Sequence, residues 1–461
     1  MPASFLDREN TVSGAGFNRF MVPPAALAVH LCIGQVYAIS TFNLPLTKLI
    51  GLTQSAPGDW TLKDVGWIFS IAIVFLGSSA AVFGHWVERV GPRKSMFVSA
   101  LCFSGGFLLS AVGIHLHQLW MIYLGYGVLG GCGLGIGYIS PVSTLIKWFP
   151  DRPGMATGMA IMGFGGGALI GAPLSVLLMK HFATPTSNGV LETFVTMGVI
   201  YFMFMMIGVI SVRVPQADWK PAGWLPAEHP RTLVTTANVS VDVAWRTPQF
   251  WLLWGVLCMN VSAGIGVLGQ ASPMIQEMFP GKITPAAAAG FVGLISLFNM
   301  VGRFFWASTS DYIGRRNTYM IFFLLGIVLY AVVPTFGHMG STPLFVAAFC
   351  VILSMYGGGF ATIPAYLRDI FGTFQVGAIH GRLLTAWSVA GVLGPVLVNY
   401  IRQYQIDNGV PKAQAYSITM YIMCGLLLIG FLCNLAMRAV NPKYYHQTKP
   451  LGSPKPGSIP A

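Results

Sequence analysis

The stretches GHWVERVGPRK at 84–94 and ASTSDYIGRRN at 307–317 decide the fold. Both place an acid, a glycine and basic residues in the same order, and they are 223 residues apart. Further pairs with the same offset are Pro141 and Pro364, Gly154 and Gly377, and Gly158 and Gly381. Since one offset recurs at several special residues, we expect two related halves, an arrangement that lets a carrier rock about a central site.

The composition excludes a water-soluble protein. Of 461 residues, 54% are hydrophobic and 9% are charged, and the mean hydropathy is +0.67. A soluble chain has roughly a quarter of its residues charged, so much of this surface must face lipid. The net charge of +12 fits the basic excess of cytoplasmic loops, so it does not indicate nucleic-acid binding.

Twelve apolar segments are long enough to cross a bilayer as helices, which predicts an all-α membrane protein with two six-helix halves. They lie at 21–45, 65–85, 95–114, 119–148, 154–180, 191–213, 249–279, 286–308, 318–336, 343–367, 377–402 and 415–437. We therefore divide the chain into an N-terminal tail (1–20), a first half (21–213), a linker (214–248), a second half (249–437) and a C-terminal tail (438–461).

The basic residues predict the orientation. With the N-terminus inside, 19 Lys and Arg residues face the cytoplasm and 6 face outward. The positive-inside rule then places both termini and the linker in the cytoplasm. We expect a multi-pass protein of the plasma membrane, which is the inner membrane if the source is a bacterium.

The two repeated stretches resemble the G-x-x-x-D/E-R-x-G-R-K/R signature of the major facilitator superfamily. The resemblance implies a gate at the cytoplasmic helix ends, in which the acids and arginines hydrogen-bond between helices. The expected gate residues are Gly84, Glu88, Arg89, Gly91, Arg93 and Lys94 in the first copy, and Asp311, Gly314, Arg315 and Arg316 in the second.

A second resemblance covers nearly the whole chain. The stretches GQVYAISTFNLPL (34–46), PAGWLP (221–226), RTPQFWLLW (246–254) and NMVGRFFWASTSD (299–311) are similar to the oxalate/formate antiporter family. Members of that family exchange or import small carboxylates, and the related monocarboxylate transporters share the arginine of the eighth helix. The resemblance therefore implies a carboxylate substrate.

The position of Arg303 within the eighth span supports a carboxylate substrate. It lies eight residues before Asp311, roughly 12 Å into a hydrocarbon core about 30 Å thick. A charge at that depth costs at least about 2.5 kcal/mol, and all fourteen acidic residues fall in tails, loops or helix ends. We expect Arg303 to bind the substrate carboxylate, with Asn299 one turn away on the same helix face. A structural role for Arg303 is the alternative.

The charge count favours a monoanion. The oxalate-transporting members have a lysine midway along the eleventh helix, where this chain has Trp387. A dianion on one arginine leaves net negative charge in a low-dielectric site, whereas a monoanion neutralises it. We therefore predict formate, lactate or pyruvate as the type of substrate, with oxalate/formate exchange as the alternative.

Other polar and aromatic residues at helix depth are weaker candidates for substrate contact, since such residues usually pack. They are Gln35, Tyr37, Tyr138, Tyr356, Phe360 and Trp387. His30 can couple a proton, although a lone histidine is more often hydrogen-bonded within the protein.

The sequence predicts a monomeric secondary carrier that works as an antiporter or a symporter. We find no nucleotide motif and no metal-ligand cluster, so we expect no cofactor, no metal and no enzymatic activity. A carrier of the same fold for a non-acidic solute and a nutrient sensor that transports little are the other interpretations.

Overall fold

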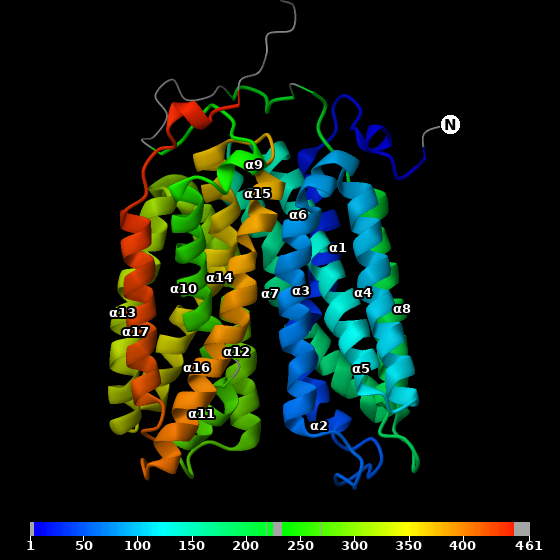
Figure 1. Cartoon of the computed structure of the whole chain (residues 1–461), viewed down its shortest axis with the longest axis vertical. Coiled ribbons are helices and arrows are strands. Elements are labelled where there is room, and N and C mark those ends of the chain that lie inside the picture. The colour runs from blue at the N-terminus through cyan, green and yellow to red at the C-terminus, as the bar shows by residue number, and fades with distance from the viewer. Residues whose placement is uncertain (1–3, 218, 225–232, 269, 447–461) are drawn as a thin grey trace, which may run out of the picture.

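The computed structural model describes residues 4–217, 219–224, 233–268 and 270–446, which form an all-helical bundle (Figure 1). The first half contains α1 (Val22–Ile33), α2 (Asn43–Leu46), α3 (Leu62–Val90), α4 (Pro92–His115), α5 (Leu119–Ile122), α6 (Gly131–Trp148), α7 (Pro153–Phe182) and α8 (Val190–Ser211). After α9 (Val241–Ala244), the second half contains α10 (Pro248–Leu268), α11 (Ala271–Met278), α12 (Pro285–Ile313), α13 (Arg315–His338), α14 (Thr342–Phe371), α15 (Val376–Leu383), α16 (Thr385–Asp407) and α17 (Ser417–Leu435). Short 3₁₀-helices are η1 (Arg8–Thr11), η2 (Arg19–Met21), η3 (Gly34–Phe42) and η5 (Pro442–Tyr444), and η4 (Tyr123–Gly130) is a π-helix.

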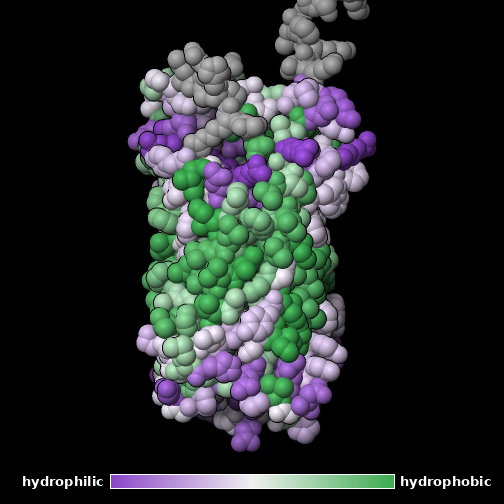
Figure 2. Space-filling model, turned by 90° about the vertical axis from the view of Figure 1, so that its left-hand side faces the viewer, coloured by the Kyte–Doolittle hydropathy of each residue, from purple (hydrophilic) through white to green (hydrophobic). Residues whose placement is uncertain are grey.

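The twelve expected spans are confirmed. Within the described residues, twelve helical segments are long and apolar enough to cross a membrane. Large apolar side chains such as Leu177 and Met203 are exposed on the outer surface, and Figure 2 shows an apolar band between two polar ends. The described chain begins, in blue, and ends, in red, at the same end of the bundle (Figure 1). We call it the terminus side.

The structure changes the course of several spans. The first span contains η3 between α1 and α2, and the fourth contains η4 between α5 and α6. The seventh, expected as one helix over 249–279, is divided into α10 and α11. Irregular helix turns inside a span are tolerated where the freed backbone groups are buried in protein or line a cavity, and they often mark functional positions.

Two glycines end the helices that carry the repeated motif. Gly91 has φ of 85° and Gly314 has φ of 89°, and each stands between one helix and the next. Residues with a side chain rarely adopt this left-handed conformation, which explains the glycine in both copies. Because α3 and α12 continue to these glycines, Glu88 and Asp311 lie in the last helical turn and not in a loop.

The two halves meet along a small set of helices. From the first half, α3 packs against α15 and α16, and α7 packs against α12 and α14. Figure 1 shows the first half in blue to teal and the second in green to red, with α7 beside the second half. The figure thus shows two bundles side by side, one from each half of the chain.

A salt bridge holds the start of the first span. The Arg19 guanidinium donates to both carboxylate oxygens of Asp151 at 2.6 and 2.9 Å, joining η2 to the α6–α7 loop. Burial opposes ionisation of Asp151, but the hydrogen bonds and the positive charge of Arg19 outweigh it. The pKa of Asp151 therefore lies below its ordinary value of 3.8.

We predict that Asp151→Asn lowers the free energy of unfolding by about 1 kcal/mol at neutral pH, because the partly buried, bidentate ion pair with Arg19 is lost. A lowered carboxyl pKa contributes stability that is complete above pH 3.8 and is lost as the pH falls below it. Thermal unfolding in detergent, compared between wild type and variant across that pH range, measures the difference. A gap that persists at the acid end would contradict this account.

Candidate functional site

Arg303 lies on α12 with no exposed surface. Its Nε donates to Asn299 Oδ1 at 3.2 Å, and its Nη1 reaches the Ile161 carbonyl oxygen of α7 at 3.5 Å. Nη2 has no hydrogen-bond partner, and no ion pair among the described residues includes Arg303. A buried guanidinium with an unused donor and no carboxylate partner is ready to receive an anion.

Aromatic rings from both halves enclose the guanidinium. Its carbon lies 5.6 Å from the ring centre of Phe164 and 5.3 Å from that of Phe360, within the range of cation–π attraction. Trp387 contacts both rings, with centroid distances of 5.3 and 4.4 Å. Since Phe164 belongs to α7 while Phe360 and Trp387 belong to α14 and α16, the two halves share this cluster.

Three tyrosines complete the cluster. The Tyr37 and Tyr356 hydroxyls, one from each half, are 3.2 Å apart. Tyr138 packs against Phe164 at 5.3 Å and Trp387 at 5.4 Å. The Tyr138 hydroxyl and Trp387 Nε1 have no hydrogen-bond partner and are buried. Two further donors are therefore unused in the same cluster as Arg303 Nη2.

Five of the six weaker candidates thus come together, whereas Gln35 does not contact the cluster in any interaction that the structure records. The Gln35 side-chain oxygen accepts from the Tyr126 hydroxyl at 2.9 Å, which places it in the packing of the first half. His30 lies beside Tyr138, with ring centres 5.4 Å apart, and its Nδ1 is 3.1 Å from the Ala26 carbonyl oxygen. His30 is therefore adjacent to the cluster.

Sequence reasoning missed several members of this site. Phe164 and the Ile161 carbonyl come from α7, and two glycines make room for the guanidinium. A Cβ on Gly165 would lie 2.9 Å from Arg303 Nε, and one on Gly357 would lie 3.0 Å from Arg303 Cγ. The glycine runs at 165–167 and 357–359 are the sequence signal that could have indicated this space.

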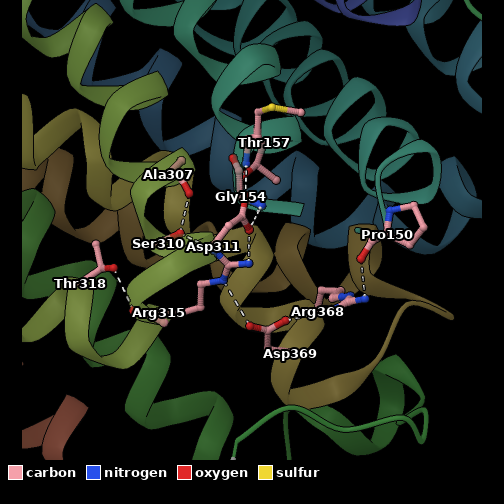
Figure 3. A network of polar contacts seen from close by, with 12 residues as sticks. Pro150, Gly154, Thr157, Ala307, Ser310, Asp311, Arg315, Thr318, Arg368 and Asp369 are labelled. Carbon is pink, nitrogen blue, oxygen red and sulfur yellow. Dashed lines mark hydrogen bonds and ion pairs between the residues drawn. The ribbon is translucent and has the colours of Figure 1, made fainter. Parts of the chain in front are cut away.

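At the terminus side, the second copy of the motif joins the halves. The Asp311 carboxylate accepts from the backbone N–H groups of Gly154 and Met155 at 2.9 and 2.8 Å, at the start of α7 (Figure 3). Arg315 donates to Asp311 at 2.6 Å and to Asp369 at 3.2 Å. A carboxylate at a helix N-terminus satisfies free donors and complements the helix dipole.

The first copy makes the symmetric contact. Glu88 accepts from the Gly377 backbone N–H at 3.1 Å, near the start of α15, and from the Lys147 ammonium at 2.7 Å. Glu88 and Asp311 are 223 residues apart, as are their partners Gly377 and Gly154. Each half thus caps a helix of the other at the terminus side.

The remaining gate candidates have other contacts. Arg93 donates to the Phe5 and Asn10 carbonyls of the N-terminal tail, and Arg316 donates to the Leu435 carbonyl within the second half. A Cβ on Gly84 would lie 2.9 Å from Ala378 Cα, so this glycine permits close contact between halves. For Arg89 and Lys94 the structure records no contact between the halves.

The comparisons with known proteins agree with this architecture. The family model of the Major Facilitator Superfamily matches residues 14–395, with a second match over 283–460. The chain belongs to the Major Facilitator Superfamily. Proteins of this superfamily are transporters, so the chain is a multi-pass membrane transporter.

Several relatives of this superfamily transporter have named substrates. The oxalate:formate antiporter of Oxalobacter formigenes is 27% identical over 376 residues, which cover 81% of this chain and 82% of that protein. Apicoplast pyruvate carrier 1 of Toxoplasma gondii is 23% identical, covering 77% and 78%. Human monocarboxylate transporter 11 is 24% identical, covering 79% and 75%. The resemblance to the antiporter family and to monocarboxylate transporters is confirmed.

Solved structures show the same fold. The proton:xylose symporter XylE superimposes with a TM-score of 0.65 at 14% identity, covering 90% of this chain and 94% of that one. The Escherichia coli fucose:proton symporter FucP gives 0.64 at 12% identity, covering 91% and 99%.

We predict that Asp311→Asn opens the terminus side. The amide keeps the size of the side chain but loses the charge that two backbone donors and Arg315 share. Charge-assisted hydrogen bonds contribute about 1.5–3 kcal/mol, so the open fraction should rise roughly tenfold or more. The measurement is the rate at which a water-soluble maleimide labels Ser143→Cys, buried beside Gly377, in a cysteine-free background.

Glu192→Gln is the matched control, because Glu192 hydrogen-bonds to Ser187 within the first half. It should leave the labelling rate unchanged. Equal rates for Asp311→Asn and Glu192→Gln would contradict the role of Asp311.

Proposed function

We propose that this transporter carries small carboxylates, most readily monocarboxylates of the formate, lactate or pyruvate type, by alternating access with Arg303 binding the carboxylate. The observation that carries the proposal is the buried guanidinium with an unpaired Nη2 and no ion pair among the described residues. A bound carboxylate supplies the missing negative charge, and the low dielectric of the buried site strengthens its electrostatic attraction to the guanidinium.

The residues around Arg303 support binding and orientation. Asn299 holds the guanidinium through Nε, which leaves the other edge for the ligand. The free donors of Tyr138 and Trp387 can take a second carboxylate oxygen or a neighbouring carbonyl or hydroxyl oxygen. Tyr37, Tyr356 and Phe360 give the site apolar walls, which suits a small organic acid.

The preference for a monoanion rests on charge. The resemblance to the oxalate/formate antiporter family implies a lysine at the position of Trp387 in the oxalate-transporting members, and Trp387 is neutral. The relative from Oxalobacter formigenes is named for oxalate and formate, so exchange of those two anions is the second candidate. The pyruvate carrier and the monocarboxylate transporter among the relatives favour the first.

The transport cycle follows from the contacts between the halves. We propose that the terminus side is cytoplasmic and that the protein acts as a monomer in the plasma membrane, or the inner membrane of a bacterium. The caps that Glu88 and Asp311 place on α15 and α7 hold the cytoplasmic side shut. Breaking them and rocking the halves opens the site inward. Exchange or proton symport drives accumulation.

We predict that Arg303→Gln abolishes uptake of labelled lactate into proteoliposomes, a loss of at least roughly a hundredfold, because the ligand loses both the charge and a paired donor. Arg303→Lys should retain part of the uptake, since it keeps the charge without the planar fork. Lys412→Gln, an exposed cation in a loop, is the control and should transport normally. Uptake unaffected by Arg303→Gln would favour a non-acidic solute.

We predict that Trp387→Lys shifts selectivity toward oxalate, because a second positive charge then compensates the second carboxylate. The ratio of oxalate to lactate uptake should rise at least about tenfold, the effect of one modest ionic contact. Trp387→Gln, which removes the ring without adding charge, separates charge from cavity size. A ratio that rises equally in both variants would contradict the charge argument.

A further inference from the structure

Two buried histidines, one from each half, have nitrogens without partners. His380 on α15 is 1% exposed, and neither of its ring nitrogens has a hydrogen-bond partner. His30 on α1 is fully buried; its Nδ1 contacts the Ala26 carbonyl, and its Nε2 has no partner. Buried polar atoms are nearly always hydrogen-bonded, so three buried nitrogens without a partner indicate a role other than packing.

Tyr138 connects the two imidazoles. Its ring centre is 5.4 Å from that of His30 and 5.8 Å from that of His380, and its own hydroxyl is unpaired. The same tyrosine packs against Phe164 and Trp387, which surround Arg303. The histidines thus adjoin the carboxylate site, on rings that both halves provide.

The charge of Arg303 acts on this group. Burial is the main factor that disfavours a proton on either imidazole, and the positive charge of Arg303 adds to it at His30. No ion pair that the described residues form includes either histidine. A proton on either imidazole would add a second positive charge to a buried region. A carboxylate bound to Arg303 cancels the first charge and removes that repulsion.

The terminus-side contact controls access to His380. Gly377 lies one turn before it and Gly381 directly after it, and both glycines are packed against the first half. A Cβ on Gly381 would fall 2.2 Å from the Ala80 carbonyl oxygen of α3, and one on Gly377 would fall 2.5 Å from Glu88 Oε1. Separation of α3 from α15 therefore uncovers His380 at the terminus side.

We propose that His30 and His380 form a proton site, divided between the halves, which fills when a carboxylate binds Arg303, so that one proton moves with each carboxylate. The proposal rests on the proposed function. The proton binds a free imidazole nitrogen and is released from it when the gate opens and the carboxylate leaves. Because binding linkage is reciprocal, the carboxylate binds more tightly as the pH falls.

Other titratable or charged groups face the pair from the packed helices. They are Tyr138 of α6, Arg303 of α12, Tyr356 of α14, Glu88 of α3 with its partner Lys147, and Asp242 of α9 with its partner Arg382. Glu88 and Asp242 are each held in an ion pair nearer the terminus side. The two histidines are the titratable groups in this region whose ring nitrogens lack partners.

Proton uptake tests the proposal directly. Lactate is added to purified protein in weakly buffered detergent, and a pH indicator records the protons taken up. Wild type should take up roughly one proton per lactate bound, and the Kd should fall by up to about tenfold for each unit that the pH is lowered. His30→Gln and His380→Gln should lower the uptake toward zero, while His338→Gln, an exposed histidine at the end of α13, should match wild type.

Exchange of labelled for unlabelled lactate separates the two proposals, since it needs no net proton movement. Retained exchange in His380→Gln, with proton uptake lost, supports the proton site and shows that the variant is folded. Wild-type protein that exchanges lactate without proton uptake would overturn the proton site and leave the proposed function intact. A wild type that binds and exchanges no carboxylate would overturn both.

Discussion

The unpaired guanidinium of Arg303 is the constraint on which the rest of the site depends. A charge buried at membrane depth is costly. Four contacts lower that cost in part: the Asn299 side-chain oxygen, the Ile161 carbonyl at 3.5 Å, and the ring faces of Phe164 and Phe360. None of these neutralises the charge. The glycines of α7 and α14 that face Arg303 keep space for its side chain and bring the two halves close around it.

Helices α12 and α7 connect the Arg303 site to the contacts at the terminus side. Helix α12 carries Arg303 and, two turns further on, Asp311, while α7 carries the Ile161 carbonyl and the N–H groups that Asp311 caps. Movement of α12 relative to α7 must therefore change both places together. This physical continuity is what alternating access requires, because an anion at Arg303 can then alter the balance between open and closed gates.

Much of the architecture is readable from the sequence, because lipid imposes strong rules on composition and length. The twelve spans and the two halves are confirmed, and the offset between Glu88 and Asp311 reappears as two equivalent helix caps. The broken course of α10 and α11 depends on local packing, which hydropathy does not report. Arg303 is identifiable from its depth alone, and its role stays a prediction. Phe164 and His380 were missed as members of the cluster, because helix rotation and contacts between distant helices cannot be derived from one sequence.

The central claim is that a substrate carboxylate forms an ion pair with the Arg303 guanidinium and accepts a hydrogen bond from Nη2. A high-resolution structure of the protein with lactate bound tests it most directly. The account predicts a carboxylate within hydrogen-bond distance, about 3 Å, of Arg303 Nη2, with its organic group against the aromatic cluster. A ligand bound elsewhere, with the Arg303 contacts to Asn299 and Ile161 unchanged and Nη2 still unpaired, would contradict it.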